Sequence, residues 1–178
     1  LYFLCLCLSV FPVGASASFI GFDDGNTSVT QPQVGTLSYG GSGGVLTGEG
    51  IDIYNVYGDG TPSNDGVGLD CVGCKLEFTT GNNVSEGPSI WEFAGGGSIT
   101  ITGEVKQGST TIANGTLVDG SFSEAFITAD GTEDGVLIMS GFGTDEKDTN
   151  LLDFFGLLFR SPCSGWESFL VVYGPDNA

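Results

Sequence analysis

The chain has 178 residues, of which 22 are acidic and four are basic, so its formal net charge at pH 7 is −18. With so few lysine and arginine side chains it cannot neutralise phosphate groups, which excludes nucleic acid and anionic lipid as partners. The chain contains no histidine, which excludes Ser-His-Asp and Cys-His catalysis and most catalytic zinc sites.

The first 17 residues have the composition of an export signal. Residues 1–13 are nearly all apolar, and Ala15-Ser16-Ala17 supplies the small residues at which a signal peptidase cleaves. The run is shorter than the roughly 20 residues of a membrane-spanning helix. We expect a signal peptide over residues 1–17, the alternative being a first strand retained in the mature protein. Because no Met or basic residue precedes Leu1, we expect the reading frame to begin upstream.

The remainder, residues 18–178, has the size of a single domain with one hydrophobic core. Apolar and polar residues alternate in several segments, a pattern typical of strands with one buried face. Turn-forming residues, mainly glycine, asparagine and aspartate, separate these segments. The predicted strands are 19–22, 34–39, 51–57, 69–81, 90–93, 98–105, 115–128, 135–142 and 169–173.

One segment departs from the two-residue period. Between residues 148 and 157, apolar residues stand at 151, 152, 154 and 155. Asp148 or Thr149 can cap a helix there, and Gly156 can end it. The sequence therefore predicts an all-β fold, a mostly antiparallel, jelly-roll-like β-sandwich with one short helix near residues 149–156. The stretch from 69 to 105 forms its centre.

The pair Cys71 and Cys74 forms the sharpest local motif. Lys75 stands where haem attachment requires histidine, and only these two and Cys163 follow the signal peptide, which is too few for a four-cysteine zinc site. A thioredoxin-type pair opens a helix, whereas a strand pattern follows here. The sequence favours a structural disulfide of an oxidising compartment, between Cys71 and Cys74 or between one of them and Cys163. One thiol then stays free.

Calcium is the most credible cofactor. Residues 130–135 place Asp130 and Asp134 in a loop that resembles the first half of a Ca²⁺ site, although no Glu occupies its twelfth position. Asp59 and Asp65 lie in a second acidic loop, and residues 145–148 form a third. The alternative for each loop is a plain hydrophilic turn.

Aromatic residues suggest a second kind of site. Trp91, Tyr54, Tyr57 and Trp166 could form a platform on which sugar rings stack. Trp91 shares its strand parity with Phe93, however, and is expected to be buried. Two carboxylates could also hydrolyse a glycosidic bond. No pair stands out among the acidic residues, so we expect a protein that is not an enzyme.

Several distinct short motifs are spread along the chain after the signal peptide: GTLSYGG at 35–41, GTP at 60–62, CVGC at 71–74, LEFTTG at 76–81, WEF at 91–93, GGGSITITG at 95–103 and LLDFFGL at 151–157. In these motifs the chain resembles bacterial secreted proteins of the PEP-CTERM, exosortase-sorted type. The resemblance implies export and an association with exopolysaccharide or biofilm matrix. The sorting segment of that group, a Pro-Glu-Pro motif with an apolar helix and an arginine cluster, does not occur within these residues.

These observations lead to three functional expectations. The first is an exported, acidic, non-enzymatic β-sandwich protein at the cell surface or in extracellular matrix, with polysaccharide or a second copy as its partner and no transmembrane segment in the mature chain. The second is a Ca²⁺-dependent carbohydrate-binding module. The third is a carboxylate-based glycoside hydrolase.

Overall fold

The computed structural model of the chain describes residues 18–23, 35–129, 137–157 and 167–173. The predicted signal peptide, the loop with Asp130 and Asp134, and Cys163 lie outside these residues. Within the described residues strands dominate and one short helix occurs. The prediction of an antiparallel all-β fold with a single short helix is therefore confirmed.

Nine strands and one helix make up the described part of the chain. Every predicted strand is present, and seven of the nine extend beyond the predicted bounds. In chain order the elements are β1 (Phe19–Asp23), β2 (Thr36–Tyr39), β3 (Val45–Asp59), β4 (Gly68–Glu86), β5 (Ile90–Phe93), β6 (Gly97–Gln107), β7 (Thr110–Ala129), β8 (Leu137–Lys147), α1 (Thr149–Phe154) and β9 (Glu167–Tyr173).

The described strands belong to one sheet, in the order β1-β3-β4-β5-β7-β8-β9, with β2 added to β3 and β6 added to β4 and β7. Strands β5 and β6 lie end to end between the same two neighbours. On β4 they pair with residues 83–86 and 70–80, respectively. On β7 they pair with residues 125–128 and 110–120. Strand pairing therefore closes into a small ring, β4-β5-β7-β6.

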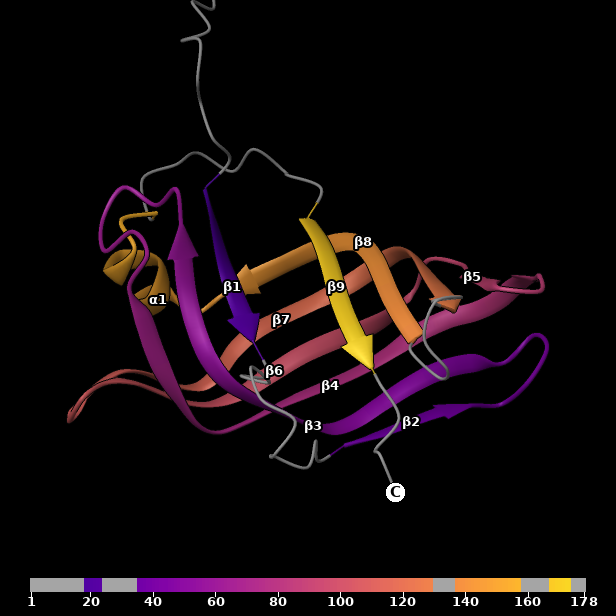
Figure 1. Cartoon of the computed structure of the whole chain (residues 1–178), viewed down its shortest axis with the longest axis horizontal. Coiled ribbons are helices and arrows are strands. Elements are labelled where there is room, and N and C mark those ends of the chain that lie inside the picture. The colour runs from indigo at the N-terminus through magenta and orange to yellow at the C-terminus, as the bar shows by residue number, and fades with distance from the viewer. Residues whose placement is uncertain (1–17, 24–34, 130–136, 158–166, 174–178) are drawn as a thin grey trace, which may run out of the picture.

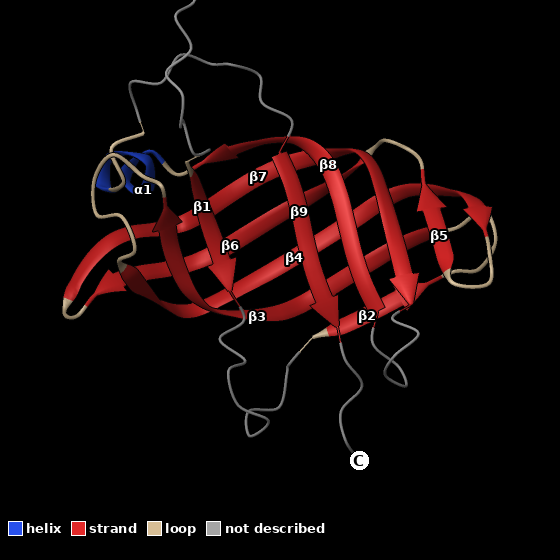
Figure 2. Ribbon diagram, turned by 45° about the horizontal axis from the view of Figure 1, so that its top comes forward, coloured by secondary structure: helices blue, strands red, loops and turns tan. Residues whose placement is uncertain are grey.

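The sheet curls, so that its two edge strands, β1 and β9, lie on the same side of the molecule, in front of β4 and β6 (Figures 1 and 2). Helix α1 lies at one end of the curled sheet, and β5 and the β2–β3 hairpin lie at the other (Figure 1). A jelly-roll sandwich, which consists of two facing sheets, is not confirmed, because all the described strands belong to a single sheet.

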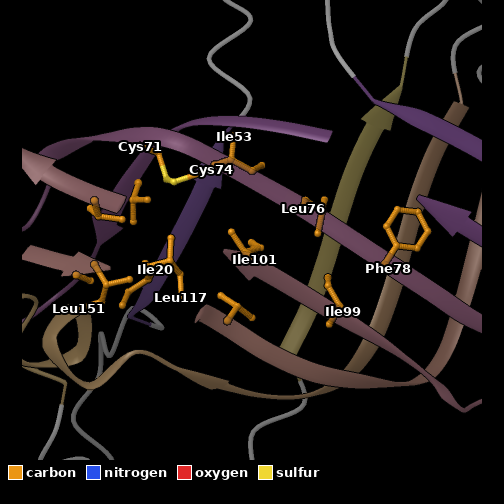
Figure 3. Packing of buried hydrophobic residues seen from close by; sticks show 14 of the residues in the cluster. Ile20, Ile53, Cys71, Cys74, Leu76, Phe78, Ile99, Ile101, Leu117 and Leu151 are labelled. Carbon is orange, nitrogen blue, oxygen red and sulfur yellow. A yellow bond between two sulfur atoms is a disulfide. The ribbon is translucent and has the colours of Figure 1, made fainter. Parts of the chain in front are cut away.

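Apolar side chains converge in one core cluster (Figure 3). They come from the strands β1, β3, β4, β5, β6 and β7 and from the helix α1 with its C-cap. Alternation along β4 explains the arrangement: Leu76 and Phe78 are buried, whereas Glu77 between them is exposed. Phe93 is also buried, and Trp91, on the same parity, is partly buried against the cluster. The predicted parity of these strands is therefore confirmed.

Helix α1 closes one end of this core. The side chain of Asp148 accepts hydrogen bonds from the backbone N–H groups of Asn150 (2.8 Å) and Leu151 (3.2 Å), as a helix N-cap does. Leu151 and Phe155 are fully buried in the core. The helix predicted near residues 149–156 is therefore confirmed, and of its two candidate caps the structure shows Asp148.

The loop between β3 and β4 holds the other end of the same helix. The side-chain amide of Asn64 donates a hydrogen bond to the carbonyl oxygen of Phe154 (2.7 Å), and the N–H of Ser63 donates to that of Phe155 (3.1 Å). Carbonyl groups at a helix C-terminus lack partners within the helix. The loop, about 90 residues upstream in the sequence, supplies hydrogen-bond donors to two of these carbonyl groups.

Candidate functional site

The Cys71–Cys74 disulfide lies within β4, at the α1 end of the core. Their Sγ atoms are bonded at 2.03 Å, and the two residues are only 6% and 1% exposed. Of the two pairings that the sequence left open, the structure shows this one (Figure 3). Because side chains alternate along a strand, residues three positions apart face the same side only where the strand is irregular.

That irregularity is a β-bulge. Gly73 and Cys74 of β4 together face the single residue Gly103 of β6, and the register shifts there. Gly73 adopts a left-handed φ of 62°, which glycine reaches without steric cost. At Gly103 a Cβ would lie 2.6 Å from the Cα of Cys74, so only glycine permits this close approach. The two glycines thus make room for the disulfide inside the sheet.

The surroundings of the disulfide indicate a structural role. Reactive cysteines are partly exposed and lie beside positive charge or a helix N-terminus. Cys71 and Cys74 instead lie within a strand that continues to Glu86, and their neighbours in the core are apolar. The bond therefore fixes the bulge and orients both halves of β4.

The second acidic loop is organised by its own hydrogen bonds. A side-chain oxygen of Asp65 accepts from the N–H of Thr61 (3.2 Å), and Asp59 lies at the exposed end of β3. Among the described residues, no group of three His, Cys, Asp or Glu side chains is placed to hold a metal ion. Asp130 and Asp134 lie outside those residues. The structure thus gives Asp65 a place in the loop that caps α1.

The prediction that residues 145–148 form a third acidic loop is wrong, because Asp145 and Glu146 lie in β8 and Asp148 is the N-cap of α1. Asp145 forms a 2.8 Å ion pair with Lys147, and the Asp145 side chain is only 2% exposed. Asp148 caps α1. These carboxylates therefore have structural partners within the chain.

The described lysines all form ion pairs with carboxylates. Lys75 contacts Asp52 on the neighbouring strand β3, and Lys106 contacts Glu104 at 2.9 Å. The hydroxyl of Thr111 and the ammonium of Lys106 hold the pKa of the Glu104 carboxyl below its usual value. Since acidic residues far outnumber basic ones, most carboxylates have no lysine to pair with. The surface therefore carries an excess of negative charge.

Of the four aromatic residues predicted for sugar stacking, Trp166 lies outside the described residues, and the other three do not form one platform. Tyr57 pairs with Gly68 near the start of β4, whereas Trp91 pairs with Glu86 at its end. Tyr54 and Tyr57 are each 37% exposed. The two tyrosines and Trp91 thus lie at opposite ends of the sheet.

The structure instead brings Tyr57 together with Phe19, which sequence reasoning missed. The register of β1 with β3 places Gly21 opposite Tyr57. A Cβ at Gly21 would lie 2.7 Å from the Tyr57 Cε1 and Oη atoms, so the tyrosine ring lies directly over this glycine. Phe19 meets the ring edge-on, with centroids 6.1 Å apart. Only the strand register reveals this pair.

A different aromatic contact closes the opposite end of the core. Tyr39 packs edge-on against Phe93, with centroids 5.7 Å apart, and its hydroxyl donates a hydrogen bond to the Glu86 carboxylate. Partial burial and the neighbouring Glu86 carboxylate raise the pKa of Tyr39 to about 12. The hydroxyl therefore stays protonated far into the alkaline range.

No described helix is both long and apolar enough to cross a membrane. Comparison with protein-family models, with curated proteins and with solved structures finds no match for this chain.

Proposed function

We propose that this chain is an exported, acidic, non-enzymatic β-protein that acts at the cell surface or in extracellular matrix. The observation that carries the proposal is the buried Cys71–Cys74 disulfide. Disulfides persist in oxidising compartments and are rare in the cytosol. The fold accommodates this bond through Gly73 and Gly103, which supports a bond that belongs to the native state.

The distribution of charged groups supports a role outside the cell that does not depend on catalysis. Asp65, Asp145 and Asp148 hold loops and the helix cap in place. The remaining surface is strongly negative, which favours solubility and repels anionic polymers. The partners we propose are therefore an extracellular polysaccharide or, through the edge strands β1 and β9, a second copy of the chain.

The test is to express the chain with its residues 1–17 in a bacterium and to fractionate the culture. We expect the protein outside the cytoplasm, beginning at Ser18, with the peptide that carries Cys71 and Cys74 resistant to alkylation until it is reduced. Reduction should lower the free energy of unfolding by about 2 kcal/mol, the value for a short closed loop. A control that replaces both cysteines by Ala should lose this response to reductant. Cytoplasmic protein with alkylated Cys71 and Cys74 would contradict the proposal.

Carbohydrate binding is the second candidate, favoured by the exposed Tyr57 ring over Gly21. If binding also requires Ca²⁺, as the acidic loops suggested, EDTA should abolish retention of the chain on a polysaccharide column. Retention that EDTA does not change would remove the Ca²⁺ requirement and leave the aromatic surface as the binding element.

A further inference from the structure

The outward face of β1, β3 and the start of β4 presents aromatic rings beside glycines and carboxylates. Phe19 pairs with Asp59, and Gly21 pairs with Tyr57. Across β3, Tyr57 also pairs with Gly68, and Asn55 pairs with Asp70. We call this the Tyr57 surface, made up of Phe19, Gly21, Tyr57, Asp59, Gly68 and Asp70.

The Tyr57 ring is held from one side and open on the other. Gly21 supports it from β1, and Phe19 packs against it edge-on. On the β4 side, a Cβ added at Gly68 would meet no atom within 4 Å. The ring is therefore fixed in orientation, 37% exposed, and bordered by an open position above Gly68.

Carboxylates lie on either side of this ring. Asp59 follows Tyr57 on the outward face of β3, and Asp70 lies two residues beyond Gly68 on β4; both are exposed. Within the described part of the chain, the lysines form their ion pairs with Asp52, Glu104 and Asp145. Lys106 lies across from Asp70 on β6 and forms its ion pair with Glu104, whereas Asp59 lies opposite Phe19. Asp59 is therefore the carboxylate most open to an external cation, and Asp70 adds negative charge beside it.

We propose that the Tyr57 surface binds a cationic amino-sugar polymer, a chain of pyranose rings that carry free ammonium groups. The C–H face of a pyranose packs on the electron-rich face of an aromatic ring, and an ammonium is attracted both to such a ring and to Asp59 and Asp70. The net charge of −18 repels anionic polysaccharides, so a polysaccharide partner is expected to be cationic. This inference deepens the proposed extracellular role and takes its biological setting from it.

The test measures binding of a glucosamine hexamer to the purified full chain by calorimetry at low ionic strength. Tyr57→Ala should weaken binding about tenfold, the scale of a cation–π contact, whereas Tyr57→Phe, which keeps the ring, should bind as the parent does. Gly68→Gln should block the open position without strain. Its matched control is Gly40→Gln, at the other end of the sheet, where an added Cβ would meet only Gly44 Cα at 4.0 Å.

Three further probes separate the causes. Asp59→Asn combined with Asp70→Asn should weaken binding severalfold, and added salt should do the same. A neutral N-acetylglucosamine hexamer should bind more weakly than glucosamine. Tyr57→Ala should weaken hexalysine binding less than glucosamine binding, because hexalysine has no pyranose ring to pack on the aromatic face. Equal binding of the neutral hexamer, equal loss for hexalysine, or an unchanged affinity in Tyr57→Ala and Gly68→Gln would each overturn the proposal. These results do not depend on where the chain is exported, so its failure is distinguishable from failure of the proposed function.

Discussion

The two ends of the curled sheet are closed by different chemistry. At one end, α1 inserts Leu151 and Phe155 into the core, and backbone and side-chain hydrogen bonds cap both ends of the helix. At the other end, Tyr39 packs on Phe93 and donates to the Glu86 carboxylate. The first closure depends on buried apolar surface and the second on a phenol–carboxylate pair. We therefore expect the helix end to dominate stability and the Tyr39 end to respond to alkaline pH.

The largest expected effect comes from Phe155→Ala. The fully buried ring lies against Gly58, where a Cβ would approach it to 2.6 Å, and its removal leaves a cavity. We expect a loss of about 3–5 kcal/mol in the free energy of unfolding, measured by chemical denaturation. The control is Val84→Ala, at the opposite end, where Val84 is 64% exposed and the expected change is within about 0.5 kcal/mol. Comparable losses in the two variants would break the comparison between the ends.

A smaller effect is expected from Asp148→Ala. The substitution removes the acceptor for the N–H groups of Asn150 and Leu151 and should cost about 1 kcal/mol, measured in the same way. Asp148→Asn keeps a capping oxygen and should retain most of this stability. Asp153→Ala, an exposed change in the same helix, serves as the matched control. If all three variants unfold alike, the cap does not stabilise the helix end.

At neutral pH the smallest effect is expected at the Tyr39 end. The native pKa of Tyr39 is raised from 10.0 to about 12, so between these values the unfolded chain loses the proton while the native chain keeps it. The stability from this contact is fully present below pH 10 and is lost as pH rises towards 12. In an absorbance titration, Glu86→Gln should lower the Tyr39 transition, which Tyr39→Phe identifies by its absence. An unchanged titration in Glu86→Gln would show that Glu86 does not set this pKa.

Strand positions were predictable because alternation reports burial directly. Ile99 and Ile101, for example, are both buried, as their parity indicated. The arrangement of the sheet was not predictable, since an apolar strand face packs equally well on a second sheet or on the far side of its own curled sheet. Asn83 shows another limit: it resembles a strand breaker, yet its side-chain amide donates to the carbonyl oxygens of Ser85 and Glu92 and carries β4 onward to Glu86.

The candidate sites were predictable to different degrees. Cys71 and Cys74 are close in sequence, so their pairing was among the alternatives that the spacing allowed. The contact of Tyr57 with Phe19 and Gly21 depends on the register between two strands, and no local pattern encodes that register. Asp65 accepts a hydrogen bond from the N–H of Thr61 only in the folded loop, so the sequence alone does not distinguish a Ca²⁺ ligand from a residue that organises the turn.

The bulge at Gly73 changes which alternate residues of β4 face the core. Before it, Leu69 and Cys71 are buried at odd positions; after it, Cys74, Leu76 and Phe78 are buried at even ones. In a regular strand of the same sequence, without the bulge, Leu76 and Phe78 would exchange places with Lys75 and Glu77. Deleting one residue between the cysteines would instead remove the bulge and leave Leu76 and Phe78 on the buried face. The number of residues between the two cysteines thus determines which side chains of the longer half of β4 face the core.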